Sequence, residues 1–215
     1  MELQGKKVVF LGDSITEGTG ATDVEHRYTN VFARIAECEI FVDGIGGTRI
    51  ARQTIPTNER WDKDFNGRAD ALPDNADIVV VFGGTNDFGH GDAPLGTFGD
   101  ETVYTFYGAL RVLCEKLIAK YPYATVVFMT PLHRLTENET VNKYGQPTPP
   151  LIEYVKAIRQ VCEQYSLPVL DLFKVSGMQP SVEIIQQTYM PDGLHPSNAG
   201  AEKIAKLLYQ FLRNL

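Results

Sequence analysis

The sequence predicts a three-layer α/β/α sandwich, in which a parallel sheet of five strands lies between two layers of helices. Short apolar runs at residues 8–11, 77–82 and 125–129 are typical of strands that are buried on both faces. Longer stretches at 102–121 and 198–212 instead repeat apolar residues at helical spacing. Strands that alternate with helices along a chain indicate a parallel sheet with helices on both faces.

The first half of the chain contains three of the predicted strands. Residues 8–11 form the first strand, 28–37 a helix, 39–42 the second strand, and 77–82 the third strand. The segment 49–73 is polar and irregular, with Trp61 and Phe65 as the expected anchors. A glycine-rich loop is expected from the third strand to about residue 99.

The second half repeats the alternation. We expect a helix at 102–121, a strand at 125–129, a polar loop at 132–150, a helix at 151–165, a short fifth strand at 168–172, a helical turn at 182–187 and a closing helix at 198–212. Phe106, Leu110, Leu113, Leu117 and Ile118 should share the buried face of the first of these helices. No linker or repeat is visible, so a single domain is expected over residues 1–215. Right-handed crossovers restrict the topology, and we expect the flavodoxin-like strand order 2-1-3-4-5.

Composition narrows the function classes. A formal net charge of −7 argues against a nucleic-acid partner, which would require a basic stripe. There is no cluster of Lys and Arg for an anionic membrane and no apolar run long enough to span a bilayer. The first residues lack the apolar core of a signal peptide, and Cys38, Cys114 and Cys162 are widely spaced. These features predict a cytoplasmic protein with free thiols, and they give no indication of its oligomeric state.

Polar motifs follow each of the first three strands. Gly12-Asp13-Ser14 follows the first, Gly46-Gly47 the second, and Gly84-Thr85-Asn86-Asp87 the third. Because parallel strands end at the same edge of a sheet, these motifs should lie close together. A fourth motif, Asp192-Gly193-Leu194-His195-Pro196, precedes the closing helix and can reach the same edge.

This set contains the groups that acyl transfer requires. Ser14 is a candidate nucleophile, but its hydroxyl needs a base. His195 is the candidate base, and Asp192 can orient it, since residues three apart can touch in a tight turn. The backbone N–H groups of Ser14 and Gly47 and the amide of Asn86 could form an oxyanion hole. Asp13 and Asp87 are expected to fix the loops through hydrogen bonds to the backbone.

The four motifs, in this order over residues 8–200, resemble the four blocks of the SGNH hydrolases, also called the GDSL esterase/lipase family. The resemblance implies Ser14 as nucleophile, Gly47 and Asn86 as oxyanion donors, and His195 with Asp192 as the rest of the triad. It also implies a flavodoxin-like fold and no required metal or cofactor. One block departs from the pattern: Val42-Asp43-Gly44 stands where the family often has Asn-x-Gly. The oxyanion glycine is therefore either Gly46 or Gly47, and Gly47 fits the spacing better.

Three other functions compete with this interpretation. Residues 14–19 approximate the phosphate loop of an FMN-binding flavodoxin, but Glu17 would repel phosphate where that loop needs glycine. A metal site could involve Asp13, His90, Asp192 and His195. A binding module without catalytic activity would have no use for the complete set of motifs.

The loops beyond the sheet edge give an expectation for the substrate. Their polar and aromatic residues predict a pocket bordered by His90, His133, Arg134 and Tyr189. Apolar residues are scattered in these loops and no amphipathic lid helix is visible. We therefore expect a short acyl group on a polar alcohol, such as an O-acetylated sugar. The alternative is a lipase or thioesterase that acts on longer acyl chains with the same triad.

Overall fold

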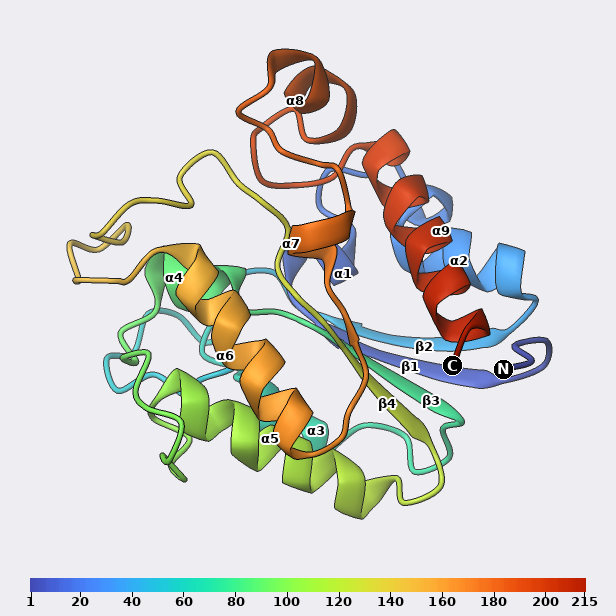
Figure 1. The fold of residues 1–215 in the computed structure, drawn as a ribbon, viewed down its shortest axis with the longest axis horizontal. Helices are drawn as coiled ribbons and strands as arrows, with labels where there is room; N and C mark the ends of the chain where they lie inside the picture. Colours follow the sequence, from blue (N-terminus) through green and yellow to red (C-terminus); the bar gives the residue numbers. More distant parts are fainter.

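The computed structural model describes residues 1–215 and contains one parallel sheet (Figure 1). Its strands are β1 (Lys7–Gly12), β2 (Glu39–Gly44), β3 (Ile78–Phe82), β4 (Thr125–Met129) and β5 (Val169–Leu170). Their order across the sheet is β2-β1-β3-β4-β5, and every pairing is parallel. The predicted fold class and strand order are therefore confirmed.

Helices cover both faces of the sheet (Figure 1). One layer consists of α2 (Tyr28–Ala36) and α9 (Asn198–Arg213), and the other of α3 (Phe65–Ala69), α5 (Phe106–Lys120) and α6 (Leu151–Gln164). Five short helices lie in the connections: α1 (Ser14–Glu17), the 3₁₀ turn η1 (Val24–His26), α4 (Thr85–His90), α7 (Leu172–Val175) and α8 (Glu183–Tyr189).

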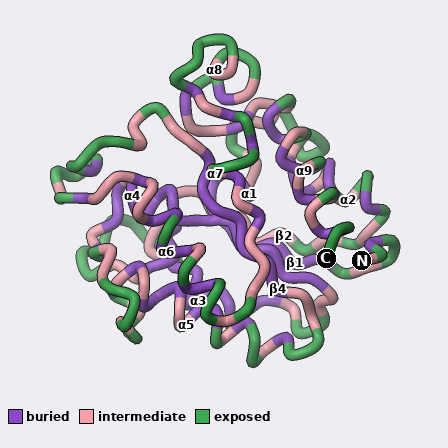
Figure 2. The backbone as a smooth tube through the Cα atoms, viewed as in Figure 1, coloured by how far each residue is buried: buried purple, intermediate pink, exposed green.

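The central strands supply the hydrophobic core on both sides of the sheet. Successive side chains of a strand point to opposite faces, so Val9 and Leu11 of β1 pack under α3 and α5 while Val8 and Phe10 pack under α2 and α9. All five residues of β3 are buried, as Figure 2 shows for the middle of the fold. This double burial explains why these strands are continuous apolar runs.

Local capping moves several boundaries away from the predicted ones. α5 begins at Phe106 rather than Thr102, because the Thr105 hydroxyl accepts a hydrogen bond from the N–H of Gly108 and caps the helix there. Ile118, which was expected on its buried face, is 37% exposed. β5 has only two residues, because Asp171 caps α7 directly after it. The short helices α3 and α4 lie in segments that were predicted to be irregular.

Cys38, Cys114 and Cys162 are free thiols, and Cys114 and Cys162 are buried in the core, whereas Cys38 is only half-buried. No helix combines the length and the apolar character that crossing a lipid bilayer would require.

The strand register brings three loops to one edge of the sheet. Gly12 at the end of β1 pairs with Gly44 at the end of β2 and with Phe82 at the end of β3. The segments that follow these three residues therefore leave the sheet side by side, and they carry the polar motifs of the sequence.

Candidate active site

Ser14 lies at the first position of α1, directly beyond the end of β1. The side chain of Asp13 caps this helix, and its Oδ1 accepts a hydrogen bond from the N–H of Ile15 at 3.0 Å. The turn between strand and helix is so tight that a Cβ at Gly12 would lie 2.0 Å from the Oγ1 of Thr16. Only glycine fits there, and the turn leaves the Ser14 side chain at the sheet edge.

A chain of hydrogen bonds connects Ser14 to the turn before α9. The Oγ of Ser14 is 3.0 Å from the Nε2 of His195, and the Nδ1 of His195 is 2.6 Å from the Oδ2 of Asp192. The other carboxylate oxygen of Asp192 accepts the backbone N–H groups of His195 at 2.7 Å and Leu194 at 2.9 Å. The ionised carboxylate of Asp192 accepts a hydrogen bond from Nδ1, so in a neutral His195 the single ring proton is on Nδ1. The Nε2 then has a free lone pair and can accept the hydroxyl proton of Ser14.

The charge of Asp192 is set by two opposing effects. Partial burial by itself raises the pKa of this carboxyl, but the hydrogen bonds from the His195 ring and from two backbone N–H groups hold the pKa below its ordinary value. Asp192 is therefore a carboxylate throughout the neutral range, and it fixes the orientation of the His195 ring.

Two backbone N–H groups beside Ser14 Oγ have no acceptor in the protein. They belong to Ser14 itself and to Gly47, which follows β2. The N–H of Gly46, in contrast, donates to the Oε2 of Glu17 at 2.8 Å and is not free. Of the two glycines that the sequence left open, Gly47 is therefore the one with an available donor, and it lines the cleft next to Ser14.

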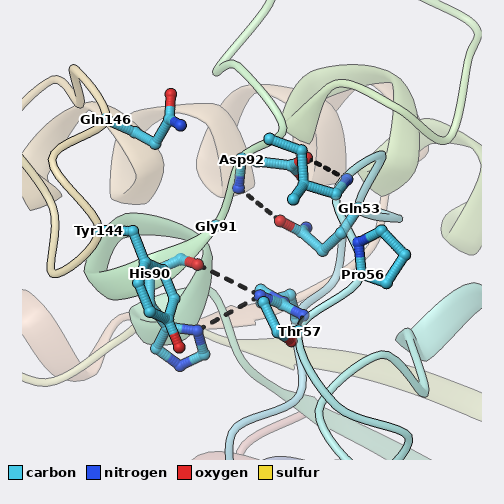
Figure 3. A pocket seen from close by; sticks show the side chains of 10 residues that line it. Gln53, Pro56, Thr57, His90, Gly91, Asp92, Tyr144 and Gln146 are labelled. Atoms are coloured by element: carbon cyan, nitrogen blue, oxygen red, sulfur yellow. Dashed lines mark hydrogen bonds between the residues drawn. The ribbon is translucent and has the colours of Figure 1, made fainter.

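The Asn86 amide on α4 is held at both ends. Its Nδ2 donates to the carbonyl of Thr48 at 3.0 Å, which leaves the second N–H of the same nitrogen without an acceptor in the protein, and its Oδ1 lies 3.1 Å from the Nε2 of His90. The guanidinium of Arg49 contacts the far side of the His90 ring, where Nη1 is 3.4 Å from Nδ1 and donates to the His90 carbonyl at 3.2 Å (Figure 3).

These contacts fix the state of His90. Burial, together with the nearby charges of Arg49, Lys143 and Arg134, lowers the pKa of His90 to about 4. The ring is neutral at physiological pH, and because Nδ1 faces a guanidinium, its single proton is on Nε2. A neutral His90 therefore donates to the Oδ1 of Asn86, which sets the direction in which the amide N–H groups point.

Asp13 and Asp87 are both fully buried beneath the site and, as expected, hold the loops. Asp87 accepts the backbone N–H groups of Ile50 at 3.0 Å and Ala51 at 2.8 Å. Burial raises the pKa of Asp13 to about 7 and that of Asp87 to about 6, against hydrogen bonds from backbone N–H groups that lower both. The Arg68 guanidinium joins the ends of β1 and β2, because it donates to the carbonyl of Gly12 at 2.8 Å and to the carbonyl of Asp43 at 3.0 Å.

A cleft of about 360 Å³ opens in front of Ser14. Its lining includes most of the predicted site residues: Ser14, Gly47, Asn86, His90, Arg134 and His195. It does not include His133 or Tyr189. The His133 ring stacks on Phe173 with a centroid separation of 3.7 Å and forms a hydrogen bond with Glu137. Tyr189, the last residue of α8, has its ring against the Nζ of Lys203. The prediction that these two side chains border the pocket does not hold in this structure.

The cleft is also lined by residues that were not among the predicted pocket residues, above all Trp61 and Lys143. Trp61 was expected only to anchor its segment, yet its indole stacks on His90 at 4.7 Å and lies against Gly47. A Cβ at Gly47, where φ is +80°, would lie 2.3 Å from the indole. On the other side of His90, a second cavity of about 350 Å³ is lined by Arg49, Gln53, Asp92 and Tyr144, among others (Figure 3).

No group of three or more His, Cys, Asp or Glu side chains has an arrangement that could hold a metal ion. Glu17, in the segment that approximates a phosphate loop, forms an ion pair with Arg60 and accepts the Gly46 N–H.

Known proteins resemble this chain over its whole length. The GDSL-like lipase/acylhydrolase family model matches residues 10–203. A solved protein from Lactobacillus plantarum is 33% identical, with 98% of each chain covered and a TM-score of 0.83. A lipase/acylhydrolase from Enterococcus faecalis is 22% identical over 97% of this chain and 96% of its own, with a TM-score of 0.66, and shows the same fold. No curated protein has significant sequence similarity.

The raised pKa of Asp13 gives a prediction for stability. Because the folded state holds this proton up to about pH 7 and the unfolded chain releases it near 3.8, the free energy of unfolding contributed by Asp13 falls as the pH rises between these values. Asp13→Asn keeps an oxygen for the Ile15 N–H and removes the titration. The variant should therefore gain stability relative to the wild type by up to about 1.4 kcal/mol per pH unit across this window.

Denaturant unfolding at several pH values measures this difference. Asp100→Asn is the control, because the hydrogen bonds from Thr97 lower the pKa of this exposed carboxyl. The stabilisation contributed by the ionised Asp100 carboxyl is lost only below the pH window. The difference in free energy of unfolding between Asp100→Asn and the wild type should therefore stay constant across the window. An equally constant difference for Asp13→Asn would contradict the prediction.

Proposed function

Because this chain belongs to the GDSL-like lipase/acylhydrolase family and is a carboxylic ester hydrolase, we propose that Ser14 is its nucleophile and that His195 and Asp192 activate it. The observation that carries the proposal is the 3.0 Å contact between the Oγ of Ser14 and the Nε2 of His195, beside N–H groups that have no acceptor. A nucleophile, an oriented base and unused donors at one point are what acyl transfer needs.

In this mechanism His195 takes the proton of Ser14 as the oxygen attacks the ester carbonyl. Asp192 stabilises the imidazolium that forms, since its carboxylate is 2.6 Å from Nδ1. The tetrahedral intermediate collapses when His195 protonates the departing alcohol, which leaves an acyl group on Ser14. Water then attacks the acyl-serine with His195 again as the base, and the carboxylic acid is released.

The negative charge of the intermediate needs donors that are already in place. We assign this role to the N–H groups of Ser14 and Gly47 and to the Nδ2 of Asn86. Neutral His90 supports Asn86 by occupying its Oδ1, so the amide need not reorient when the charge develops.

For the substrate we propose a short acyl group on a polar alcohol, such as an O-acetylated sugar. The cleft of about 360 Å³ is at the lower end of the size range of small-molecule sites. Trp61 and Leu194 are its large apolar side chains, and the other lining residues with side chains are polar or charged. Such a surface can form hydrogen bonds with hydroxyl groups. It offers little apolar area to a fatty chain, and burial of each CH₂ of such a chain is worth only about 0.8 kcal/mol.

Ser14→Ala tests the nucleophile. Loss of a triad serine in a comparable enzyme lowers kcat by roughly 10⁶, so we expect hydrolysis of 4-nitrophenyl acetate to fall close to the background rate while the far-UV circular dichroism is retained. A fluorophosphonate should label the wild type at Ser14. Ser181→Ala, at an exposed serine, is the control and should keep full activity and labelling. Substantial turnover by Ser14→Ala, or a label on another residue, would refute the assignment.

Asn86→Ala tests the oxyanion hole. A donor that acts mainly in the transition state should lower kcat by about 10²–10³ and leave KM nearly unchanged. Asn75→Ala is the control, because this exposed asparagine precedes β3 at the opposite edge of the sheet. Steady-state kinetics of both variants measure the difference. If Asn86→Ala mainly raised KM, the side chain would belong to substrate binding instead.

A series of 4-nitrophenyl esters tests the acyl preference. Since the cleft is small and polar, kcat/KM should decrease steeply from acetyl or butyryl to octanoyl, and acetylated sugars should be deacetylated. A preference for octanoyl or longer chains would support the lipase or thioesterase alternative, with the same triad.

A further inference from the structure

Two cationic side chains line the cleft without a carboxylate partner. Arg134 and Lys143 both border the cavity in front of Ser14, and neither forms an ion pair with Asp or Glu within 4.0 Å. No Asp or Glu lines the cleft. We call the part of the cleft formed by Arg134 and Lys143 the cationic wall. It carries positive charge in a chain whose formal net charge is −7.

The Arg134 guanidinium is held through its Nε and Nη1 atoms. Its Nη1 donates to the carbonyl and hydroxyl of Thr85 at 3.1 and 3.2 Å, its Nε donates to the Thr136 hydroxyl at 3.0 Å, and the group lies over the Phe88 ring at 5.3 Å. The Nη2 has no acceptor in the protein. Burial lowers the pKa of Arg134, so the fold bears a cost for placing this cation here.

Lys143 is brought to the same wall by a structured turn. Asn142 donates from Nδ2 to the carbonyl of Gly91 at 2.7 Å, and its Oδ1 accepts the N–H groups of Tyr144 and Gln146 at 3.0 Å each. The backbone N–H of Lys143 donates to the carbonyl of Gly89 at 3.0 Å, and its Nζ is 5.0 Å from the Trp61 ring. The turn is thus attached to the end of α4.

Both cations flank Gly89 on α4. A Cβ at Gly89 would lie 2.9 Å from the Nη1 of Arg134, while the carbonyl of Gly89 accepts from Lys143. Their fields reach the centre of the site, because both charges contribute, after burial and Arg49, to the lowered pKa of His90. Cations in a concave site attract anionic ligands, and the missing counter-charge can come from a substrate.

We propose that the ester bound in this cleft carries an anionic group, a carboxylate or a phosphate, that is held between Arg134 and Lys143. The inference rests on the proposed function, since it concerns the substrate of the same site. The Nη2 of Arg134 and the Nζ of Lys143 are the donors, and charge-assisted hydrogen bonds to such a group are stronger than neutral ones. The anion can belong to the alcohol or to the acyl part of the ester.

Isosteric ester pairs test the proposal and separate these two sources. For the alcohol part, 3-carboxy-4-nitrophenyl acetate is compared with 3-carbamoyl-4-nitrophenyl acetate. For the acyl part, the 4-nitrophenyl monoester of fumaric acid, whose trans double bond keeps the carboxylate away from its own ester, is compared with that of fumaramic acid. Each kcat/KM is divided by the uncatalysed rate constant of the same ester. In at least one pair the charged ester should be favoured by roughly two- to fivefold, the upper part of the range that one solvent-accessible charge pair supplies, and added salt should reduce the preference.

Variants of Arg134 and Lys143 show whether the preference for the charged ester arises from these two side chains. Lys143→Gln should reduce the ratio of charged to neutral ester toward one, Lys143→Arg should retain it, and Arg134→Gln combined with Lys143→Gln should abolish it. Lys7→Gln is the matched control: this exposed lysine has no acidic partner within 4.0 Å and begins β1 at the opposite edge of the sheet, so the ratio should not change.

The outcomes are distinct from those of the nucleophile test. A ratio of one or less in both pairs for the wild type overturns the inference, as does a preference that survives in the double variant. Neither result affects the proposed hydrolysis, which is judged on the neutral esters by the loss of their turnover in Ser14→Ala. If Ser14→Ala hydrolysed the neutral esters normally, the proposed function would fail whatever the charge preference.

Discussion

The buried carboxylate of Asp87 joins the two loops on which the site depends. Its two oxygens accept the N–H groups of Ile50 and Ala51, and this connects the segment after β2 to α4 after β3. The neighbouring bond from Asn86 to the Thr48 carbonyl runs between the same segments. Oxyanion stabilisation requires donors that do not move as charge develops. A fully buried carboxylate between two N–H groups supplies that rigidity, at a cost that is visible in its raised pKa.

The central strands could be predicted from the sequence because burial alone determines them. A strand covered on both faces must be apolar along its length, and residues 78–82 meet this condition without any knowledge of their neighbours. α4 could not be predicted in this way, because its sequence contains Gly89 and residues that favour turns. It is helical because Asn86 and Asp87 are bonded to a segment that lies far away in the sequence.

The same contrast applies to the side chains of the site. The sequence indicated Ser14, His195 and Asp192 because each follows a strand or precedes a helix, and the structure brings them within hydrogen-bonding distance. Spacing could not show that His133 would turn away to stack on Phe173. Nor could it show that Lys143, in the middle of a polar loop, would be attached to α4. Side chains on long loops are placed by distant contacts, and a local pattern carries no record of those contacts.

The cleft therefore divides into two parts with different tolerance to change. Ser14 and Asn86 follow central strands and are buried, and Asn86 is held by Thr48 and His90, which are themselves buried. Arg134 and Lys143 come from the loop between β4 and α6, and Lys143 is exposed. Exposed substitutions usually change the free energy of unfolding by no more than about 0.5 kcal/mol, whereas leaving a buried carboxylate such as Asp87 without its partners costs several-fold more. The charge that Lys143 contributes to the cationic wall can thus change at little cost to the fold, and in this architecture the selection of the substrate is physically separable from the groups that would perform the chemistry.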